Sequence, residues 1–308
     1  MYFLNEEEKR LLLRRILPEA RQKEIAQELR GWNWDKPPLS PIYSSIKLGV
    51  AEIANNYCTT NRDLYLRRVM NIKMPQNRAM LEGGIFHDVL CNLIINVKKL
   101  IYLYGTSCLK HLNTLKKEKI LKISDLTENL LSPEDIASIK EKIDIIWEYE
   151  LHNIYTRIQN VLISQPYVGP DALVALALPI SVEQKLNGAF IGLSSHLSAD
   201  AFIFSEPMVV DIKFGKKQEF HKLSVTGYAL VMESLYEYPI NVGCIVYPSF
   251  NGDQLKIERN FYFIDDELRQ WFIEERDERT RMIYEEIDPG VAKDCPETCP
   301  LWRECHPV

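Results

Sequence analysis

The sequence lacks the features that would place the protein in a membrane or outside the cell. It contains no run of the roughly 18 or more apolar residues that a membrane-spanning helix needs. Residues 1–8 show neither the basic nor the apolar segment of a signal peptide. We therefore expect a cytoplasmic protein that does not bind membranes.

Internal repeats and low-complexity segments are also absent. With 46% hydrophobic and 26% charged residues, the chain has the composition of a protein with a sizeable core. Its 308 residues suit one large domain or two small ones. We expect four stretches that pack as one compact unit: a helical segment with the first clustered cysteine (1–80), a helical region with a histidine motif (81–178), a core sheet (179–264), and an acidic helix followed by clustered cysteines (265–308).

The chain has no overall excess of positive charge, and its net charge is −6. This deficit comes from residues 265–288, which hold ten acids and four arginines, so the rest of the chain is neutral. The distribution of charge matters more than its sum, and nucleic-acid binding is therefore not excluded. Two groups of basic residues are candidates: Arg62, Arg67, Arg68, Lys73 and Arg78, and Lys213, Lys216, Lys217 and Lys222.

The seven cysteines do not suggest a disulfide framework, because their number is odd and the chain is long for one. Cys91, Cys108 and Cys244 lie in apolar runs and are typical of core thiols. The others are Cys58 and a group of three near the C-terminus, Cys295, Cys299 and Cys305. Four thiolates suit a [4Fe–4S] cluster or a structural zinc ion. The one-plus-three spacing favours iron–sulphur, since zinc sites usually combine two close pairs.

Hydrophobic periodicity predicts a helical first half and a mixed α/β core. Ser132-Pro133-Glu134-Asp135 is a good helix start. Helices are expected at 84–104, 132–162, 218–236 and 265–286, and strands at 65–69, 180–186, 189–193, 197–204, 208–214, 240–247 and 255–263.

The run Asp211-Ile212-Lys213 places an acid and a base at the end of an apolar strand. Side chains alternate along a strand, so Asp211 and Lys213 share one face, while Val210 and Phe214 take the core face. Such a pair can hold a divalent cation and polarise a phosphate, although the tripeptide is common and also fits a surface ion pair.

Asp200 lies on the preceding predicted strand, before a turn at Ser205-Glu206-Pro207. If the connection has an even number of residues, Asp200 faces Asp211 or Lys213, and an odd number puts it on the opposite face. Two adjacent carboxylates repel each other unless a cation with a preference for oxygen ligands neutralises them.

His87, in Gly83-Gly84-Ile85-Phe86-His87, adds an imidazole at the start of the apolar helix, which would suit a softer divalent ion such as Mn²⁺. A single helical histidine is also often structural.

In this order the residues resemble the RecB-like branch of the PD-(D/E)XK nucleases, which show G-x-x-x-H, an Asp, (D/E)-x-K and Q-x-x-x-Y. Here these are Gly83 to His87, Asp200, Asp211-Ile212-Lys213, and a helix with Tyr228, where Ser224 replaces the glutamine. The resemblance implies an α/β (α+β) fold with a restriction-endonuclease-like core, in which helices flank a mixed central sheet.

The resemblance also implies roles for individual residues. His87, Asp200, Asp211 and the Ile212 carbonyl would bind one or two Mg²⁺ or Mn²⁺ ions. Lys213 would act with Asp211 and Asp200 in catalysis, and Glu183 would be an outer acid. Tyr228 and Lys222 would contact DNA.

The cysteine arrangement around such a core resembles the CRISPR-associated "Cas four" nucleases, which implies a [4Fe–4S] cluster on Cys58, Cys295, Cys299 and Cys305. Met1-Tyr2-Phe3-Leu4, Glu28 to Trp34 and Ser194 to Asp200 resemble the archaeal branch called "Csa one".

The expected function is metal-dependent trimming of DNA, mainly single-stranded ends, during CRISPR spacer acquisition beside the CRISPR integrase and other adaptation proteins. The alternative, favoured by Ser224, is a non-catalytic nuclease-like subunit that binds DNA or protein. A homo-oligomer is compatible with both functions.

Overall fold

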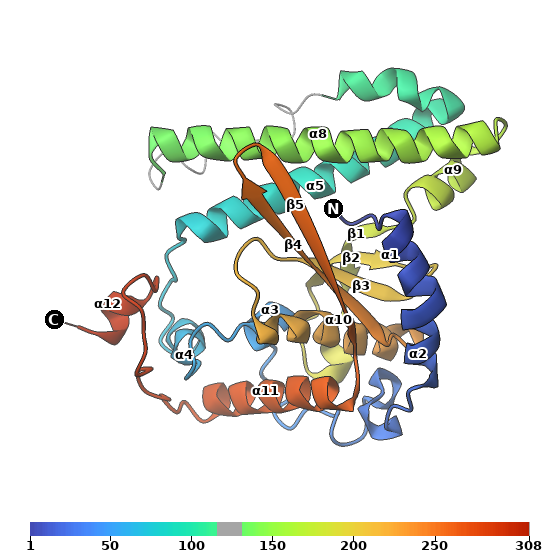
Figure 1. Ribbon diagram of the computed structural model, residues 1–308. Coiled ribbons are helices and arrows are strands. Elements are labelled where there is room, and N and C mark those ends of the chain that lie inside the picture. The colour runs from blue at the N-terminus through green and yellow to red at the C-terminus, as the bar shows by residue number, and fades with distance from the viewer. Residues whose placement is uncertain (116–130, 308) are drawn as a thin grey trace.

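The computed structural model describes residues 1–115 and 131–307, and it places a five-stranded sheet between two layers of helices (Figure 1). Part of the predicted helical region 81–178, namely residues 116–130, lies outside the described residues. The strands follow one another across the sheet in chain order. They are β1 (Ser181–Leu186), β2 (Leu197–Ile203), β3 (Met208–Ile212), β4 (Val242–Asn251) and β5 (Gln254–Phe263).

Only the β3–β4 pair is parallel, and the other neighbouring strands are antiparallel. The parallel pair needs a crossover connection, which is supplied by helix α10 (Lys222–Tyr236). The mixed sheet and its flanking helices confirm the α+β class that the sequence predicted.

One layer contains the two long helices α5 (Arg78–Tyr104) and α8 (Pro133–Ser164) together with α9 (Pro170–Ala177) (Figure 1). As predicted, Ser132 caps α8, and its hydroxyl accepts a hydrogen bond from the Asp135 backbone. The predicted helix from residue 84 is confirmed, but α5 begins earlier because the Asn77 side chain caps it.

The second layer contains α10 against the sheet and α11 (Asp266–Tyr284) outside it (Figure 1). The N-terminal segment packs around both layers. Its short helices are α1 (Glu6–Leu11), η1 (Leu12–Ile16), α2 (Leu17–Gln22), η2 (Gln27–Leu29), η3 (Gly31–Asn33), α3 (Val50–Ala54) and α4 (Arg62–Arg68). Further short helices in the described residues are η4 (Gly105–Thr114) after α5, η5 (Ala189–Ile191) between β1 and β2, η6 (Glu219–His221) before α10, and α12 (Trp302–Cys305) in the C-terminal segment.

Strand β3 alternates as its sequence predicts. Val210 and Ile212 belong to the core cluster that includes α5 and α8, whereas Val209 belongs to the cluster around α10. Asp211 follows Val209 onto the α10 side and is only 3% exposed. The sheet therefore buries an acid at the end of its central strand.

Two predicted strands are wrong. Residues 65–69 lie in and directly after α4, whose Arg67 and Arg68 pair with Glu52 of α3. Residues 189–193 form η5 and a turn in which Gly192 has φ 76°, a backbone conformation that a strand does not adopt. Short apolar runs have no periodicity of their own that separates helix from strand, so tertiary contacts decided both.

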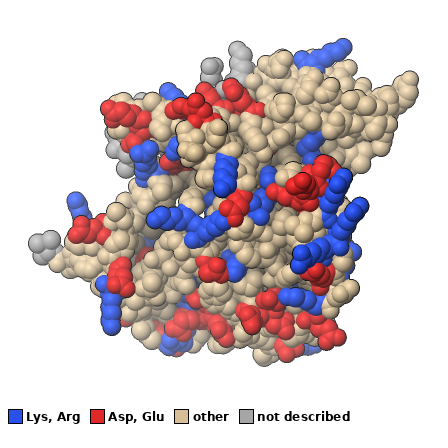
Figure 2. Space-filling view, viewed as in Figure 1, with Lys and Arg blue, Asp and Glu red and all other residues tan. Residues whose placement is uncertain are grey.

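Helix α11 turns three of its four arginines inward. Arg269, Arg276 and Arg279 are all but fully buried, while Arg281 pairs with exposed glutamates. Red side chains consequently gather along the lower edge of Figure 2, over α11. The acidic stretch of the sequence thus forms an acidic surface, and three of its four arginines lie in the interior.

Among the described residues, the helical stretch Arg78–Thr114 is long and apolar enough to cross a membrane by length and composition alone. A core helix of a soluble protein has the same length and composition. Phe86, Leu90, Leu93 and Val97 of this stretch are buried in the core.

Candidate nuclease centre

Three carboxylates lie side by side across β1, β2 and β3. Val182 pairs with Ala201 and Gln184 with Ala199, which places Glu183 opposite Asp200. Ala201 pairs with Val210, and one residue further along the two strands Asp200 faces Asp211. The connection from 204 to 207 has four residues, the even number that this arrangement requires.

Asp200 is held against the end of β3 by the backbone. Its Oδ2 atom accepts a hydrogen bond of 3.0 Å from the Ile212 amide. Burial and the charge of Asp211 raise the pKa of Asp200 to about 6, although His87 and Lys213 act in the opposite direction. A carboxylate in this position repels its neighbour, so the pair would gain from a bound cation.

Asp211 and Lys213 form an ion pair on the face predicted from strand alternation. Lys213 Nζ lies 2.9 Å from Asp211 Oδ2. Burial alone would lower the pKa of Lys213, but the charges of Asp211 and Asp200 outweigh it and raise the pKa. Among the described residues, no hydrogen-bond donor other than this ammonium approaches the buried Oδ2 atom.

Helix α5 brings His87 to the row of acids. Its Nδ1 atom lies 3.7 Å from Asp200 Oδ2, and its Nε2 atom lies 2.5 Å from Glu183 Oε1. Burial opposes a charge on the ring, but a hydrogen bond with Cys91 and the charge of Asp200 raise the pKa of His87 to about 10. His87, Asp200, Asp211 and Lys213 are thus brought together, as their predicted roles require.

Glu183 lies closer to the centre than an outer acid would. Burial alone would raise its pKa, but hydrogen bonds from His87, Ser198 and Lys185 lower it to about 2. The backbone of Glu183 has φ 50°, an uncommon conformation for a residue other than glycine. Unusual backbone geometry of this kind occurs preferentially at functional sites.

Oxygen ligands at this centre fit a divalent cation. Asp200 and Asp211 supply two carboxylates at neighbouring positions, and burial together with the charge of Asp211 raises the pKa of Asp200. Mg²⁺ and Mn²⁺ prefer such ligands, and Mn²⁺ also accepts imidazole. The residues present therefore suit the metal that the sequence led us to expect.

Two neighbours of His87 were not predicted as part of the site. Cys91 Sγ lies 3.4 Å from His87 Nε2, and the Tyr2 hydroxyl lies 3.4 Å from His87 Nδ1. The spacing of four residues between His87 and Cys91 on a helix could have indicated the first contact. Nothing in the sequence around Tyr2 indicates the second, which depends on the path of the N-terminal segment.

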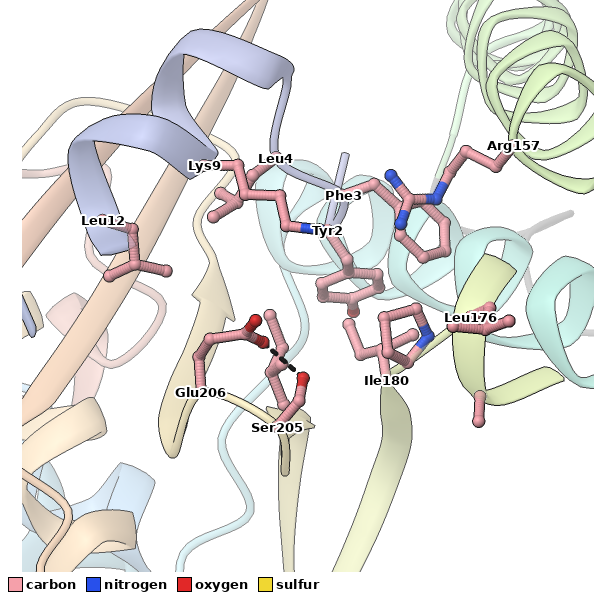
Figure 3. Close-up of a pocket in the computed structure, with 13 residues that line it drawn as sticks. Tyr2, Phe3, Leu4, Lys9, Leu12, Arg157, Leu176, Ile180, Ser205 and Glu206 are labelled. Atoms are coloured by element: carbon pink, nitrogen blue, oxygen red, sulfur yellow. Dashed lines mark hydrogen bonds between the residues drawn. The ribbon is translucent and has the colours of Figure 1, made fainter. Parts of the chain in front are cut away.

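Tyr2 also lines a cavity of about 220 Å³ behind the centre. In Figure 3, Arg157 lies over the Phe3 ring on one side of this cavity, and Ser205 and Glu206 lie on the other. The cavity does not include the carboxylates of the nuclease centre. Tyr2 therefore contacts both His87 of the candidate centre and this cavity.

Helix α10 places its two predicted DNA contacts differently. Tyr228 is buried, and burial together with the charges of Asp211 and Asp200 raises its pKa. Lys222 instead pairs with Glu219 and lies over the Tyr262 ring, 5.0 Å from its centre. Ser224, at the position of the expected glutamine, lines a pocket of about 130 Å³ together with Lys213 and Tyr57.

The C-terminal segment brings its three cysteines towards Cys58. Burial and the neighbouring thiols of Cys299, Cys305 and Cys58 raise the pKa of Cys295. Arg62 holds this segment through two hydrogen bonds to Asp288, of 2.8 and 2.7 Å. All four cysteines are partly exposed, and their thiols suit a [4Fe–4S] cluster or zinc.

Comparison with known proteins gives the chain its family. The family model described as CRISPR-associated exonuclease Csa1 matches residues 1–308. The chain belongs to the Csa1 family. A protein of Saccharolobus solfataricus, named CRISPR-associated exonuclease Csa1, is 32% identical over 92% of this chain and 94% of its own length.

A second relative with the same name, from Thermoproteus tenax, is 30% identical and covers 96% of both chains. Membership of the Csa1 family thus confirms the branch that the sequence resembled. The family match covers the helical first half, the sheet and the cysteine-rich tail.

Proposed function

We propose that this chain is a metal-dependent DNA nuclease that acts on the ends of DNA, mainly single-stranded, during CRISPR spacer acquisition. The observation that carries the proposal is the meeting of Asp200 and Asp211 on adjacent strands, with Lys213 2.9 Å from Asp211. The names of both relatives, CRISPR-associated exonuclease, support the same class of activity.

Asp200, Asp211, the Ile212 carbonyl and His87 would hold one or two Mg²⁺ or Mn²⁺ ions. Bound there, the metal would polarise a phosphodiester and lower the pKa of the attacking water. Lys213 would orient that water and stabilise the negative charge that develops on the phosphate. Glu183, through its 2.5 Å contact, would position the His87 ring.

Phosphate ester hydrolysis is very slow without a catalyst, so the centre must lower the barrier by an amount on the order of 10–20 kcal/mol. Asp200, Asp211 and the Lys213 ammonium would already be in position before substrate binds, which would avoid a cost of reorganisation during the reaction. Tyr228 would act from α10 beside the acids, and Lys222 would contact the DNA backbone after leaving Glu219.

We further propose a [4Fe–4S] cluster on Cys58, Cys295, Cys299 and Cys305. Hydrolysis requires no electron transfer, so the cluster would be architectural and would join the α3–α4 connection to the C-terminal segment. The CRISPR integrase and other adaptation proteins would be the partners, and the protein would act in the cytoplasm.

The test compares Asp211→Ala and Lys213→Ala with the parent on labelled single-stranded DNA in the presence of Mn²⁺. Each variant should lose about 100-fold or more in cleavage rate, because each removes a group that acts on the developing charge. The exposed Lys256→Ala is a matched control and should cut at the parental rate. Parental rates in both Asp211→Ala and Lys213→Ala would show that the site is wrongly assigned.

A non-catalytic DNA-binding or protein-binding subunit is the second candidate. It is favoured by Ser224, which leaves a small pocket beside Lys213 where the family pattern has a glutamine. No cleavage with Mg²⁺, Mn²⁺ or Co²⁺, combined with retained binding of DNA, would support this candidate over the nuclease.

A further inference from the structure

The His87 ring has two chemically different edges. Its Nδ1 atom faces Asp200 and the hydroxyl of Tyr2. Its Nε2 atom faces Glu183 Oε1 at 2.5 Å and Cys91 Sγ at 3.4 Å. The second edge therefore collects a nitrogen, a sulphur and an oxygen donor that the proposed nuclease reaction does not use as metal ligands.

We propose that His87, Cys91 and Glu183 form a binding site for Zn²⁺, separate from the Asp200–Asp211 pair. One potential ligand atom from each of the three residues lies within 4.8 Å of the others. Imidazole, thiolate and carboxylate are the ligands that zinc takes in proteins, and Mg²⁺ does not bind thiolate in this way. Three protein ligands with an open fourth position are typical of an accessible zinc site.

The geometry of α5 suits such a site. His87 and Cys91 are four residues apart, so their side chains lie on the same face of the helix, one turn apart. With metal–ligand bonds of about 2.0–2.3 Å, neighbouring ligands of a tetrahedral zinc ion lie roughly 3.3–3.8 Å apart. The 3.4 Å between Nε2 and Sγ already falls in this range.

Glu183 is the ligand that must move. Its 2.5 Å contact with Nε2 is a hydrogen-bonding distance, and an ion in place of the proton needs about 1 Å more between the two atoms. The carboxylate has space to retreat, because its side chain is 35% exposed and β1 is an edge strand of the sheet. The move must keep or replace the hydrogen bonds that Ser198 and Lys185 donate to its other oxygen. Cys91, by contrast, is buried at 4% exposure, so it provides a fixed ligand.

Zinc bound at Nε2 would inhibit the proposed DNA cleavage, because it would fix which nitrogen of His87 carries the proton. A neutral imidazole has one nitrogen lone pair, and its other nitrogen carries a proton. Zinc on Nε2 fixes the proton on Nδ1, so His87 then has no lone pair for a Mg²⁺ or Mn²⁺ ion beside Asp200. Zinc should therefore inhibit cleavage. This consequence rests on the proposed function, whereas zinc binding does not.

The binding test titrates Zn²⁺ against a competing chelator, using the anaerobically purified full chain. The parent should bind one equivalent more than Cys91→Ser, or bind it at least 10-fold more tightly, since serine keeps the size but loses the soft ligand. Cys108→Ser is the matched control: it removes another buried thiol, and it should titrate as the parent does. Any zinc taken by the four clustered cysteines is common to all three proteins and cancels in the comparison.

Glu183→Gln gives a second and independent variant on a part-exposed strand. It keeps a hydrogen-bonding side chain beside His87 but removes the charge, and it should also weaken zinc binding about 10-fold. Equal zinc stoichiometry and affinity in the parent, Cys91→Ser and Glu183→Gln would overturn the proposal.

The inhibition test measures Mn²⁺-dependent DNA cleavage against zinc concentration, with each protein normalised to its own zinc-free rate. Half-inhibition should need about 10-fold more zinc in Cys91→Ser than in the parent or in Cys108→Ser. Equal zinc sensitivity in all three would overturn the competition at His87. A parent that binds zinc through Cys91 but never cuts DNA would remove the proposed nuclease function and leave the zinc site standing.

Discussion

Asp200 is a partly buried acid, with a side chain 23% exposed, and its neighbours shift its pKa in opposite directions. Burial and the charge of Asp211 raise the pKa of Asp200 to about 6, and the charges of His87 and Lys213 partly offset this rise. The Ile212 amide fixes one of its oxygens. These contacts hold the Asp200 carboxylate where a cation would relieve its repulsion with Asp211. The suitability of Asp200 as a metal ligand therefore comes from its position beside Asp211, since an isolated aspartate would lack it.

Glu233 is the residue for which a single change should cost most stability. It is fully buried on α10 and pairs with Arg269 at 2.7 and 2.9 Å. It also accepts hydrogen bonds from Arg30 and from the Gly31 and Ile240 amides. This carboxylate thus joins η3, α10 and α11.

Glu233→Gln should lower the free energy of unfolding by about 3–5 kcal/mol, because it leaves the buried Arg269 guanidinium without its counter-charge. Urea denaturation of the two proteins measures the difference. Glu237→Gln, an exposed change just after the same helix, should stay within about 0.5 kcal/mol of the parent. A similar small change for Glu233→Gln would contradict the role of this pair.

The crossing of α10 and α11 shows how one element is fitted to another. A Cβ atom at Gly227 would lie 2.4 Å from the Phe272 ring and 3.0 Å from Val50 Cγ1. Phe272 is itself almost fully buried, so it has little room to move. The glycine therefore sets how closely the two helices approach.

Gly227→Ala should destabilise the protein by about 1–3 kcal/mol, the usual cost of overpacking a core. Gly84→Ala is the matched control, since Gly84 also lies within a helix but has no atom within 4 Å of its added Cβ. That control should be neutral or gain about 0.5–1 kcal/mol. Thermal unfolding followed by circular dichroism distinguishes the two, and equal effects would contradict the close approach.

The elements also show what periodicity can predict. The long helix α8 and the strands of the sheet were predicted because their apolar patterns extend over many residues or end at clear turns. Residues 65–69 and 189–193 were predicted wrongly, because a run of five residues fits a short helix or a turn equally well. The ion pair with Glu52 holds Arg68 in helix α4, and the positive φ of Gly192 makes a turn after η5. The apolar pattern of each five-residue run contains neither feature.

At the scale of the whole molecule, the C-terminal segment returns to the start of α4. Thr60 donates a hydrogen bond of 2.9 Å to the Gly290 carbonyl, and Arg62 pairs with Asp288. These contacts bring Cys58 near cysteines more than 230 positions later in the chain. A cluster on these thiols would therefore close a long loop of the chain.

Cys58→Ala should lose the brown colour of the anaerobically purified protein, along with about four irons per chain, because a [4Fe–4S] cluster needs four thiolates. It should also unfold at a lower temperature, since the C-terminal segment loses its cross-link. Cys244→Ala, which removes a core thiol, should keep its iron. Colourless parent protein with one zinc per chain would show that the site holds zinc instead.

The sequence by itself determined the family, through its motifs, and the alternation that puts Asp211 and Lys213 on one face, because strand geometry repeats every two residues. The tertiary structure decided that the connection from β2 to β3 has four residues, so that Asp200 meets this pair. It also decided what surrounds His87: Cys91 and Glu183 at one edge of the ring, Asp200 and Tyr2 at the other. Those contacts join α5, two strands and the N-terminal segment, and their directions depend on how these elements pack, which no local pattern encodes.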